Sequence, residues 1–114
     1  MDNVTTLLLF DYYGDMLTER QRLCLDLRYN QDLSLSEIAE ELGVSRQAAY
    51  DNIARAEVHL QNMETKTGCV RRYLQMREAV EIILKNAEQL TSHPDLIVSE
   101  AADKIICAAN SIEV

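Results

Sequence analysis

Residues 35–53 read LSEIAEELGVSRQAAYDNI, and this stretch decides the fold. Ser34 and Glu37 form a capping box that opens a helix over 35–42, and Gly43 ends that helix because glycine adopts a positive φ at low cost. Ser45 is placed to cap the next helix. Two helices joined by about three or four residues cross at roughly 90–120°. The pattern therefore predicts a helix-turn-helix motif over 35–53.

Apolar spacing around the turn agrees with this motif. The crossing of the two helices needs a small residue, and Ala39 supplies it, while Val44 is placed to plug the core after the turn. The residues expected to close a small core with the preceding helix are Ile38, Leu42, Ala49 and Ile53. Agreement between independent local signals is the evidence for the fold.

The rest of the chain also has helical periodicity. Apolar spacing and breaks predict further helices over about 4–16, 18–29, 70–91 and 95–110, and a long helix after Ser45, which makes six helices and no sheet. A break at Thr67-Gly68 divides the chain into a helix-turn-helix domain, 1–67, and a helical hairpin, 68–114. We expect an all-α protein whose hairpin packs on the first domain, on a second chain, or on both.

Composition excludes several classes of protein. With 3 Gly and 1 Pro in 114 residues, the chain lacks the turns of an all-β fold, and it has no apolar stretch long enough to span a membrane. The acidic start is unlike a signal peptide, so we expect a cytoplasmic protein. Cys24, Cys69 and Cys107 are too far apart for a zinc site, and His59 and His93 stand alone.

Carboxylate pairs are the only candidates for chemistry. Asp11 with Asp15 and Glu37 with Glu41 lie one helical turn apart, and such pairs on surface helices are usually solvated. The sequence has no nucleophile–base pair, phosphate-binding loop or metal cluster. We therefore expect no enzyme, no cofactor and no metal.

The function of a helix-turn-helix is to present its second helix to the DNA major groove. The candidate DNA-binding residues are Ser45, Arg46, Gln47, Tyr50, Asp51 and Arg55. Arg46 can contact guanine O6 and N7, and Gln47 can pair with adenine. Ser45 with the helix amides suits a phosphate, and Arg55 can reach the DNA backbone. The alternative is an ordinary solvated helix face.

Net charge opposes DNA binding, because the chain carries 19 acidic and 11 basic residues and a charge of −8. A candidate phosphate-binding patch consists of Lys66, Arg71, Arg72 and Arg77. Its alternative role is to solvate a helix start. A homodimer would double the contacts and place two half-sites about 34 Å apart. The acidic helices over 78–114 would then form the dimer or partner surface.

Two stretches carry a resemblance to known families. The run LTERQRLCLDLRY, 17–29, followed by LSEIAEELGVSR resembles region 4 of bacterial sigma factors over residues 17–60. With LLLFDYYGDMLTERQ, 7–21, and GVSRQAAYDNIARAE, 43–57, the whole chain resembles the YlxM-like family of small helix-turn-helix proteins. Ala48, Tyr50 and Asp51 depart from sigma recognition helices, which usually carry basic or amide residues there.

The resemblance implies a sigma region 4-like bundle with DNA as partner and a role in transcription regulation. It also implies a part in the signal recognition particle pathway, because the family typically lies in the operon of the particle's GTPase, Ffh. The alternative function is a protein-interaction module of that secretion pathway that has kept the fold without DNA binding. Its acidic helices over 78–114 would suit a basic partner.

Overall fold

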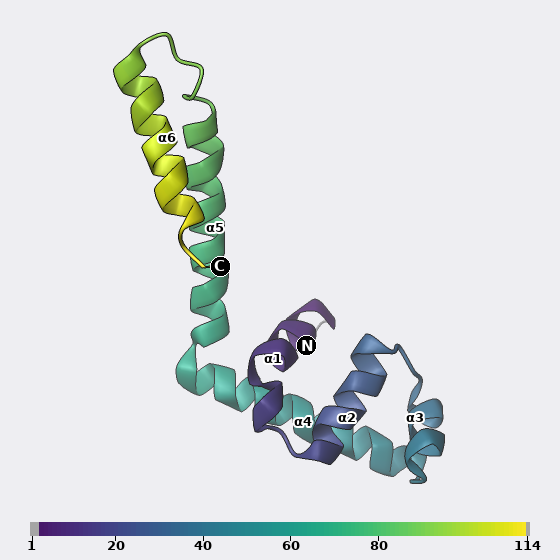
Figure 1. Cartoon of the computed structure of the whole chain (residues 1–114). Coiled ribbons are helices and arrows are strands. Elements are labelled where there is room, and N and C mark those ends of the chain that lie inside the picture. Colours follow the sequence, from purple (N-terminus) through teal and green to yellow (C-terminus); the bar gives the residue numbers. More distant parts are fainter. Residues whose placement is uncertain (1–2, 114) are drawn as a thin grey trace. The chain divides into compact units, whose positions relative to one another are not determined.

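The structure, a computed structural model, describes residues 3–113, with side chains from Val4 onward. Within this range it has six α-helices and no strand, which confirms the predicted all-α fold (Figure 1). The helices are α1 (Asn3–Tyr13), α2 (Glu19–Leu25), α3 (Leu35–Leu42), α4 (Arg46–Thr67), α5 (Cys69–Glu88) and α6 (Leu96–Asn110). They form two compact units, Met1–Val70 and Arg71–Val114. None of the described helices has the length and apolar character that a membrane span requires.

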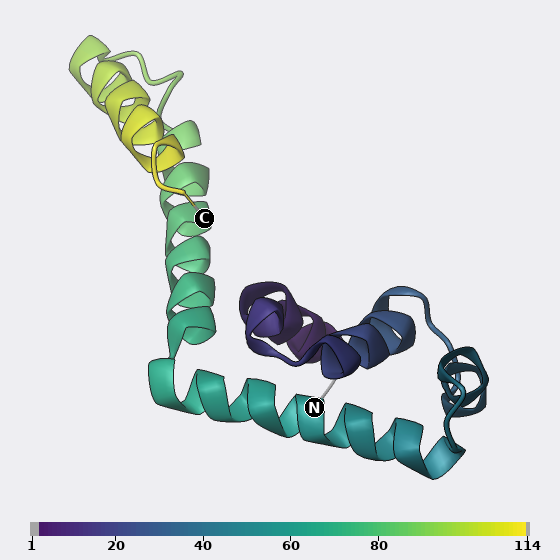
Figure 2. The ribbon, with the colours of Figure 1, turned by 60° about the horizontal axis from the view of Figure 1, so that its bottom comes forward.

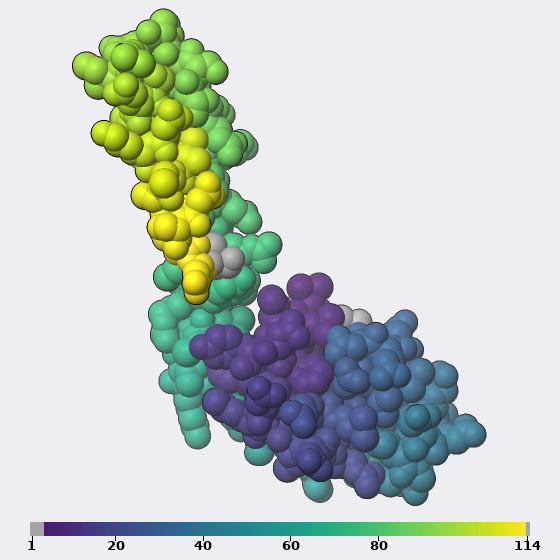
Figure 3. All heavy atoms as spheres, in the orientation of Figure 1, coloured from purple at the N-terminus to yellow at the C-terminus, as the bar shows by residue number. Residues whose placement is uncertain are grey.

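The long helix α4 is the base of the N-terminal unit. It contacts α1, α2 and α3, which lie along it in both ribbon views (Figures 1 and 2). Four of its residues recur at helical spacing and are buried: Ala49, Ile53, Ala56 and Leu60. They join one cluster with buried residues from the other helices, including Leu9, Tyr13, Leu25 and Ile38. In the space-filling view α1, α2 and α3 make one continuous body (Figure 3).

Two predicted helices are shorter than expected as regular α-helices. The first ends at Tyr13 and continues as a 3-10 turn over Gly14–Met16. A Cβ on Gly14 would lie 2.7 Å from the Phe10 ring, so any larger residue would require that ring to shift. The second ends at Leu25 and continues as a π-turn over Asp26–Asn30.

Side chains support the π-turn. The carboxylate of Asp26 accepts hydrogen bonds from the Asn30 and Gln31 side-chain amides at 2.8 and 3.2 Å. The Arg28 guanidinium donates to the carbonyl of Leu33 at 3.1 Å, beyond the end of the turn. Periodicity of apolar residues does not report such polar contacts, which is why the change of helix type was not predicted.

The carboxylate of Glu64 connects α1 to the end of α4. It accepts a hydrogen bond from the hydroxyl of buried Tyr13 at 2.7 Å and another from the backbone N–H of Val70 at 3.0 Å. The Tyr13 hydroxyl also bonds to the hydroxyl of Thr67. Burial raises the pKa of Tyr13, and the Glu64 carboxylate adds to this effect. Glu64 therefore supports the turn at Gly68, which adopts a left-handed conformation with φ 63°.

A second tyrosine gives a pH-dependent prediction. The Tyr29 hydroxyl donates to the carboxylate of Glu57 on α4, and burial together with this carboxylate raises the pKa of Tyr29 to about 12. An unfolded tyrosine ionises near pH ~10. The folded state therefore holds this proton more tightly, so its contribution is complete below about pH 10 and is lost as the pH rises toward about 12.

We expect the urea concentration at the unfolding midpoint of the wild type to decrease as the pH rises from about 10 to about 12. The midpoint of the Tyr29→Phe variant should decrease less over the same range. Tyr13 leaves part of the decline in the variant, because its pKa is raised as well. Tyr73→Phe, at an exposed tyrosine of α5, is the matched control and should follow the wild type. Parallel curves for Tyr29→Phe and the wild type would contradict the role given to this hydroxyl.

The C-terminal unit is a hairpin in which α6 returns along α5 (Figure 1). Pro94 lies in the turn, and the Asp95 carboxylate caps α6 by accepting from the backbone N–H of Ile97 at 2.9 Å. This confirms the predicted turn and hairpin. Buried residues of the unit are few: Val80, Ala87, Ala102 and Ala109.

Candidate nucleic-acid interface

The turn between α3 and α4 is built as the sequence predicts. Ser34 and Glu37 form both hydrogen bonds of the capping box, each at 3.1 Å. Gly43 adopts the left-handed conformation with φ 66°, and the backbone N–H of Val44 returns to the carbonyl of Ala39 at 3.0 Å. The Ser45 hydroxyl accepts from the backbone N–H of Ala48 at 3.0 Å, so α4 begins at Arg46. These contacts fix the direction in which α4 leaves the turn.

The crossing has the predicted packing. Ile38 and Ala39 on α3 are buried, as are Ala49 and Ile53 on α4, while Val44 packs against the same cluster from the turn. Figure 2 shows α3 beside the N-terminal end of α4. The start of α4 is therefore held by its inner face, and its outer face remains available for contact.

The candidate DNA-binding residues lie on that outer face, but they are divided between its two edges. Ser45, Arg46, Gln47 and Tyr50 are exposed on the first turns of α4, and Asp51 is half-buried. Arg55 is also exposed, but it lies nine residues after Arg46, which at about 100° per residue places it half a turn away. The structure thus brings Arg46 and Tyr50 to one edge of the face and puts Arg55 on the other.

One polar contact on this face was missed by sequence analysis. The Gln47 side-chain amide donates to the Asp51 carboxylate at 3.0 Å. The spacing of four residues was the available signal, because side chains at this spacing are neighbours on a helix. The contact occupies the amide donor with which Gln47 would bind adenine. The Asp51 carboxylate also gives the middle of the face a negative charge.

The surroundings of the motif are acidic. The exposed carboxylates of α3 are Glu37, Glu40 and Glu41, and α3 carries no basic residue. A phosphate that approached over α3 would therefore meet like charges. The groups near the motif that are chemically suited to a phosphate are Ser45, the N–H groups at the start of α4, and the arginines of α4.

The predicted phosphate-binding patch is spread over two elements. Lys66 lies in the last turn of α4, and Arg71, Arg72 and Arg77 lie on α5. At about 100° per residue, the side chains of Arg72 and Arg77 leave α5 in widely different directions. Arg77 also forms an ion pair with Glu81 at 3.4 Å, between side chains that are both more than half exposed. The arginines of α5 therefore do not share one face of the helix.

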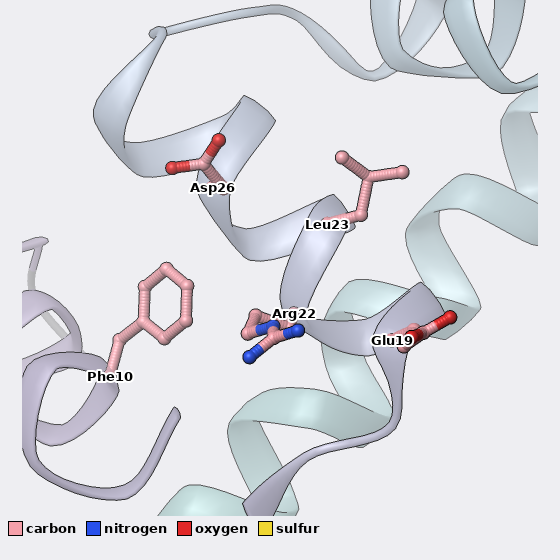
Figure 4. Close-up of a pocket in the computed structure, with 5 residues that line it drawn as sticks. All are labelled: Phe10, Glu19, Arg22, Leu23 and Asp26. Atoms are coloured by element: carbon pink, nitrogen blue, oxygen red, sulfur yellow. The ribbon is translucent and has the colours of Figure 1, made fainter. Parts of the chain in front are cut away.

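Two shallow pockets lie in the N-terminal unit. One is lined by Phe10, Glu19, Arg22, Leu23 and Asp26, and Figure 4 shows how these side chains surround it. The other is lined by Gln21, Ala54, Arg55, Val58 and His59, so Arg55 borders an apolar depression between α2 and α4. Among the residues that the structure describes, no three His, Cys, Asp or Glu side chains are grouped as a metal site would require.

Residues 2–105 match the family described as "Putative helix-turn-helix protein, YlxM / p13 like", also named UPF0122. The chain belongs to this family. A UPF0122 protein of Acetivibrio thermocellus is 48% identical over 83 residues, which cover 73% of this chain and 71% of the relative. A UPF0122 protein of Halalkalibacterium halodurans is 40% identical over 98 residues, covering 85% and 90%. A third, from Clostridium kluyveri, is 43% identical over 98 residues, covering 86% of each.

Membership of the UPF0122 family confirms the resemblance drawn from residues 7–21 and 43–57. The match covers both structural units up to residue 105, and its range includes α3, the Gly43 turn and the start of α4.

Proposed function

We propose that this UPF0122 protein is a DNA-binding regulatory protein whose α4 enters the major groove with its N-terminal turns. The observation that carries the proposal is the exposed group of Arg46, Gln47 and Tyr50 at the start of a helix whose inner face is buried. Arg46 binds guanine O6 and N7, and Gln47 binds adenine after leaving Asp51. Tyr50 contacts a sugar or a thymine methyl group.

Backbone contacts complete this mode of binding. Ser45 and the first N–H groups of α4 bind a phosphate, and Arg55 reaches the DNA backbone from the other edge of the face. Residues 1–67 form the DNA-binding domain in this proposal, and 68–114 form the partner-binding hairpin. We also propose Lys66, Arg71, Arg72 and Arg77 as backbone contacts, which would act separately because the α5 arginines do not share one face of that helix. We place the protein in the cytoplasm and assign it no catalytic reaction.

Net charge limits the affinity that one copy reaches. At −8, and with few basic residues on the face, one chain should bind nonspecific DNA weakly, with a shallow dependence on salt. We therefore propose a homodimer, in which two copies of α4 contact half-sites about 34 Å apart. The expected weak dependence on salt is tested by titrating duplex DNA at several salt concentrations. A steep fall of affinity with salt would require more phosphate contacts than the face supplies.

Removal of the central carboxylate should strengthen DNA binding. The Asp51→Asn variant loses the negative charge beside Gln47, and we expect affinity to rise roughly two- to tenfold at low salt. Asp11→Asn removes the same charge from an exposed position on α1 and is the matched control. Dissociation constants from fluorescence anisotropy measure both. Equal effects of the two substitutions would show that Asp51 acts only through net charge.

A second function is favoured by the acidic surroundings of the motif. Asp51 on α4 and three carboxylates on α3 make the same surface suitable for a basic protein. We propose as the alternative a protein-interaction module of the signal recognition particle pathway. Crosslinking in cells followed by purification separates the two functions. Enrichment of a discrete DNA site supports the regulator, and recovery of Ffh without DNA supports the interaction module.

A further inference from the structure

The hairpin of α5 and α6 buries too little apolar surface to be stable by itself. Its buried residues are Val80 and three alanines, whereas the N-terminal unit has a cluster that includes several leucines and two isoleucines. Units of about 40 residues usually need a metal, a disulfide or an additional chain to fold stably. The Cys107 thiol is free and exposed, and no disulfide involves it. A further apolar surface must therefore cover the hairpin.

Part of the exposed apolar surface of the hairpin forms a regular face, while Ile82, Leu96 and Ile97 are exposed outside it. Its members, here called the hairpin face, are Met76, Ile83, Leu90, Val98, Ile105 and Ile112. Each series steps by seven residues, which is the spacing of helices that supercoil around one another. Leu90 and Ile112 continue the two series two residues beyond the ends of α5 and α6. Five of the six side chains are between 42% and 50% exposed, and Val98 is half-buried. The face is thus half covered by the hairpin itself.

Both series lie on the same side of the hairpin. Ile83 follows buried Val80 by three residues, and Ile105 follows buried Ala102 by three residues. The buried residues of each helix face the other helix. Because α5 and α6 run in opposite directions, a step of three residues from these buried residues leads to the same side of the hairpin on both helices. The buried residues themselves also recur at seven, as Val80 and Ala87 show. The buried residues and the hairpin face therefore occupy the two apolar positions of a coiled-coil repeat. The buried residues are packed inside the hairpin, and the hairpin face is only partly covered.

Charge distinguishes between occupants of this face. Three carboxylates lie on the side of the hairpin away from this face. Glu81 and Glu88 each follow a face residue by five positions, a rotation of about 140° around the helix. Asp103 precedes Ile105 by two positions, a rotation of about 160°. The face itself holds no charged residue. A basic partner would bind the acidic side, whereas two copies of the hairpin face can meet without bringing like charges together.

We propose that the hairpin face binds the hairpin face of a second copy, so that two hairpins form a four-helix bundle. In such a bundle each half-exposed side chain becomes buried between helices. A face two helices wide and about 25 Å long covers roughly 500 Å² per copy, so the pair buries about 1,000 Å², near the lower limit for a specific dimer. The same patch on both copies gives a two-fold axis.

Binding of two copies of α4 to one DNA duplex rests on the proposed function. The pairing of two hairpins does not depend on that function. A dimer that fails to bind DNA would leave this inference standing, and a monomer that binds DNA would overturn it alone. The test is therefore made on the full chain without DNA.

Sedimentation equilibrium at micromolar concentrations should show a dimer for the wild type and a monomer for the Ile83→Glu variant. Leu74→Glu is the matched control, because Leu74 has similar exposure, 39% against 44% for Ile83, and lies on the opposite side of α5. This control should remain a dimer. Circular dichroism of each variant establishes that its helices are intact.

If Ile83→Glu loses helical structure, the milder Ile105→Ala variant provides the test. Its dimer dissociation constant should rise roughly tenfold or more, since each dimer loses two apolar side chains. A monomeric wild type would overturn the proposal. So would a folded Ile83→Glu variant that remains a dimer, or an Ile105→Ala variant that dimerises as tightly as the wild type.

Discussion

Replacement of Arg46 by alanine should weaken specific DNA binding by about 1–3 kcal/mol and relax the preference at one base pair of the site. The side chain is exposed at the first residue of α4, where the recognition helix of a helix-turn-helix contacts base edges. Because the loss comes from a base contact, affinity for sites that already lack the preferred base should change much less. Competition between matched and altered duplexes measures this difference.

Arg22→Ala is the matched control for this prediction. It removes the same charge from α2, where the Arg22 guanidinium contacts the Asp15 carboxylate at 3.4 Å. We expect a small and uniform effect across DNA sequences, since only long-range attraction changes. If Arg46→Ala binds its site as tightly as the wild type, or loses affinity equally for all sequences, Arg46 does not read a base.

Replacement of Leu60 by alanine should lower the free energy of unfolding of the N-terminal unit by about 2–5 kcal/mol. Leu60 lies on the buried stripe of α4 and is fully buried in the cluster that joins α1, α2 and α3 to α4. The substitution removes buried methyl groups and leaves a cavity that the surrounding helices fill only in part. Urea unfolding followed by circular dichroism gives the change.

Val58→Ala provides the comparison within the same helix. Val58 is 58% exposed and points away from the buried stripe, so its truncation should change stability by less than about 0.5 kcal/mol. Similar losses for Leu60→Ala and Val58→Ala would mean that α4 is not held by this stripe. That outcome would remove the support for the outer face that carries Arg46.

Local signals were sufficient to predict most of the fold. The capping box at Ser34, the left-handed Gly43 and the cap at Ser45 each act over a few residues, so they can be read from the sequence directly. The buried stripe of α4 has helical periodicity for the same reason. These features fix where the helices of the motif begin and end, and hence which side of α4 faces outward.

Contacts between distant residues could not be predicted in this way. The Tyr13 hydroxyl meets Glu64 across 51 positions, and Tyr29 meets Glu57 across 28, and neither pair has a spacing that identifies it. The separation of Arg55 from Arg46, by contrast, follows from their nine-residue spacing once α4 is known to run through both residues. The pairing of Gln47 with Asp51 has a readable spacing, yet a spacing alone does not show that the bond forms.

A binding selection from random duplex oligonucleotides, made with the full-length wild type and Arg46→Ala in parallel, tests the central claim most directly. Runs at low and near-physiological salt separate base readout from general attraction to phosphate. We predict that the wild type enriches a defined motif and that Arg46→Ala loses the preference at one position of it, most plainly a guanine. Recovery of no motif by the wild type at either salt concentration would contradict the claim that α4 reads DNA.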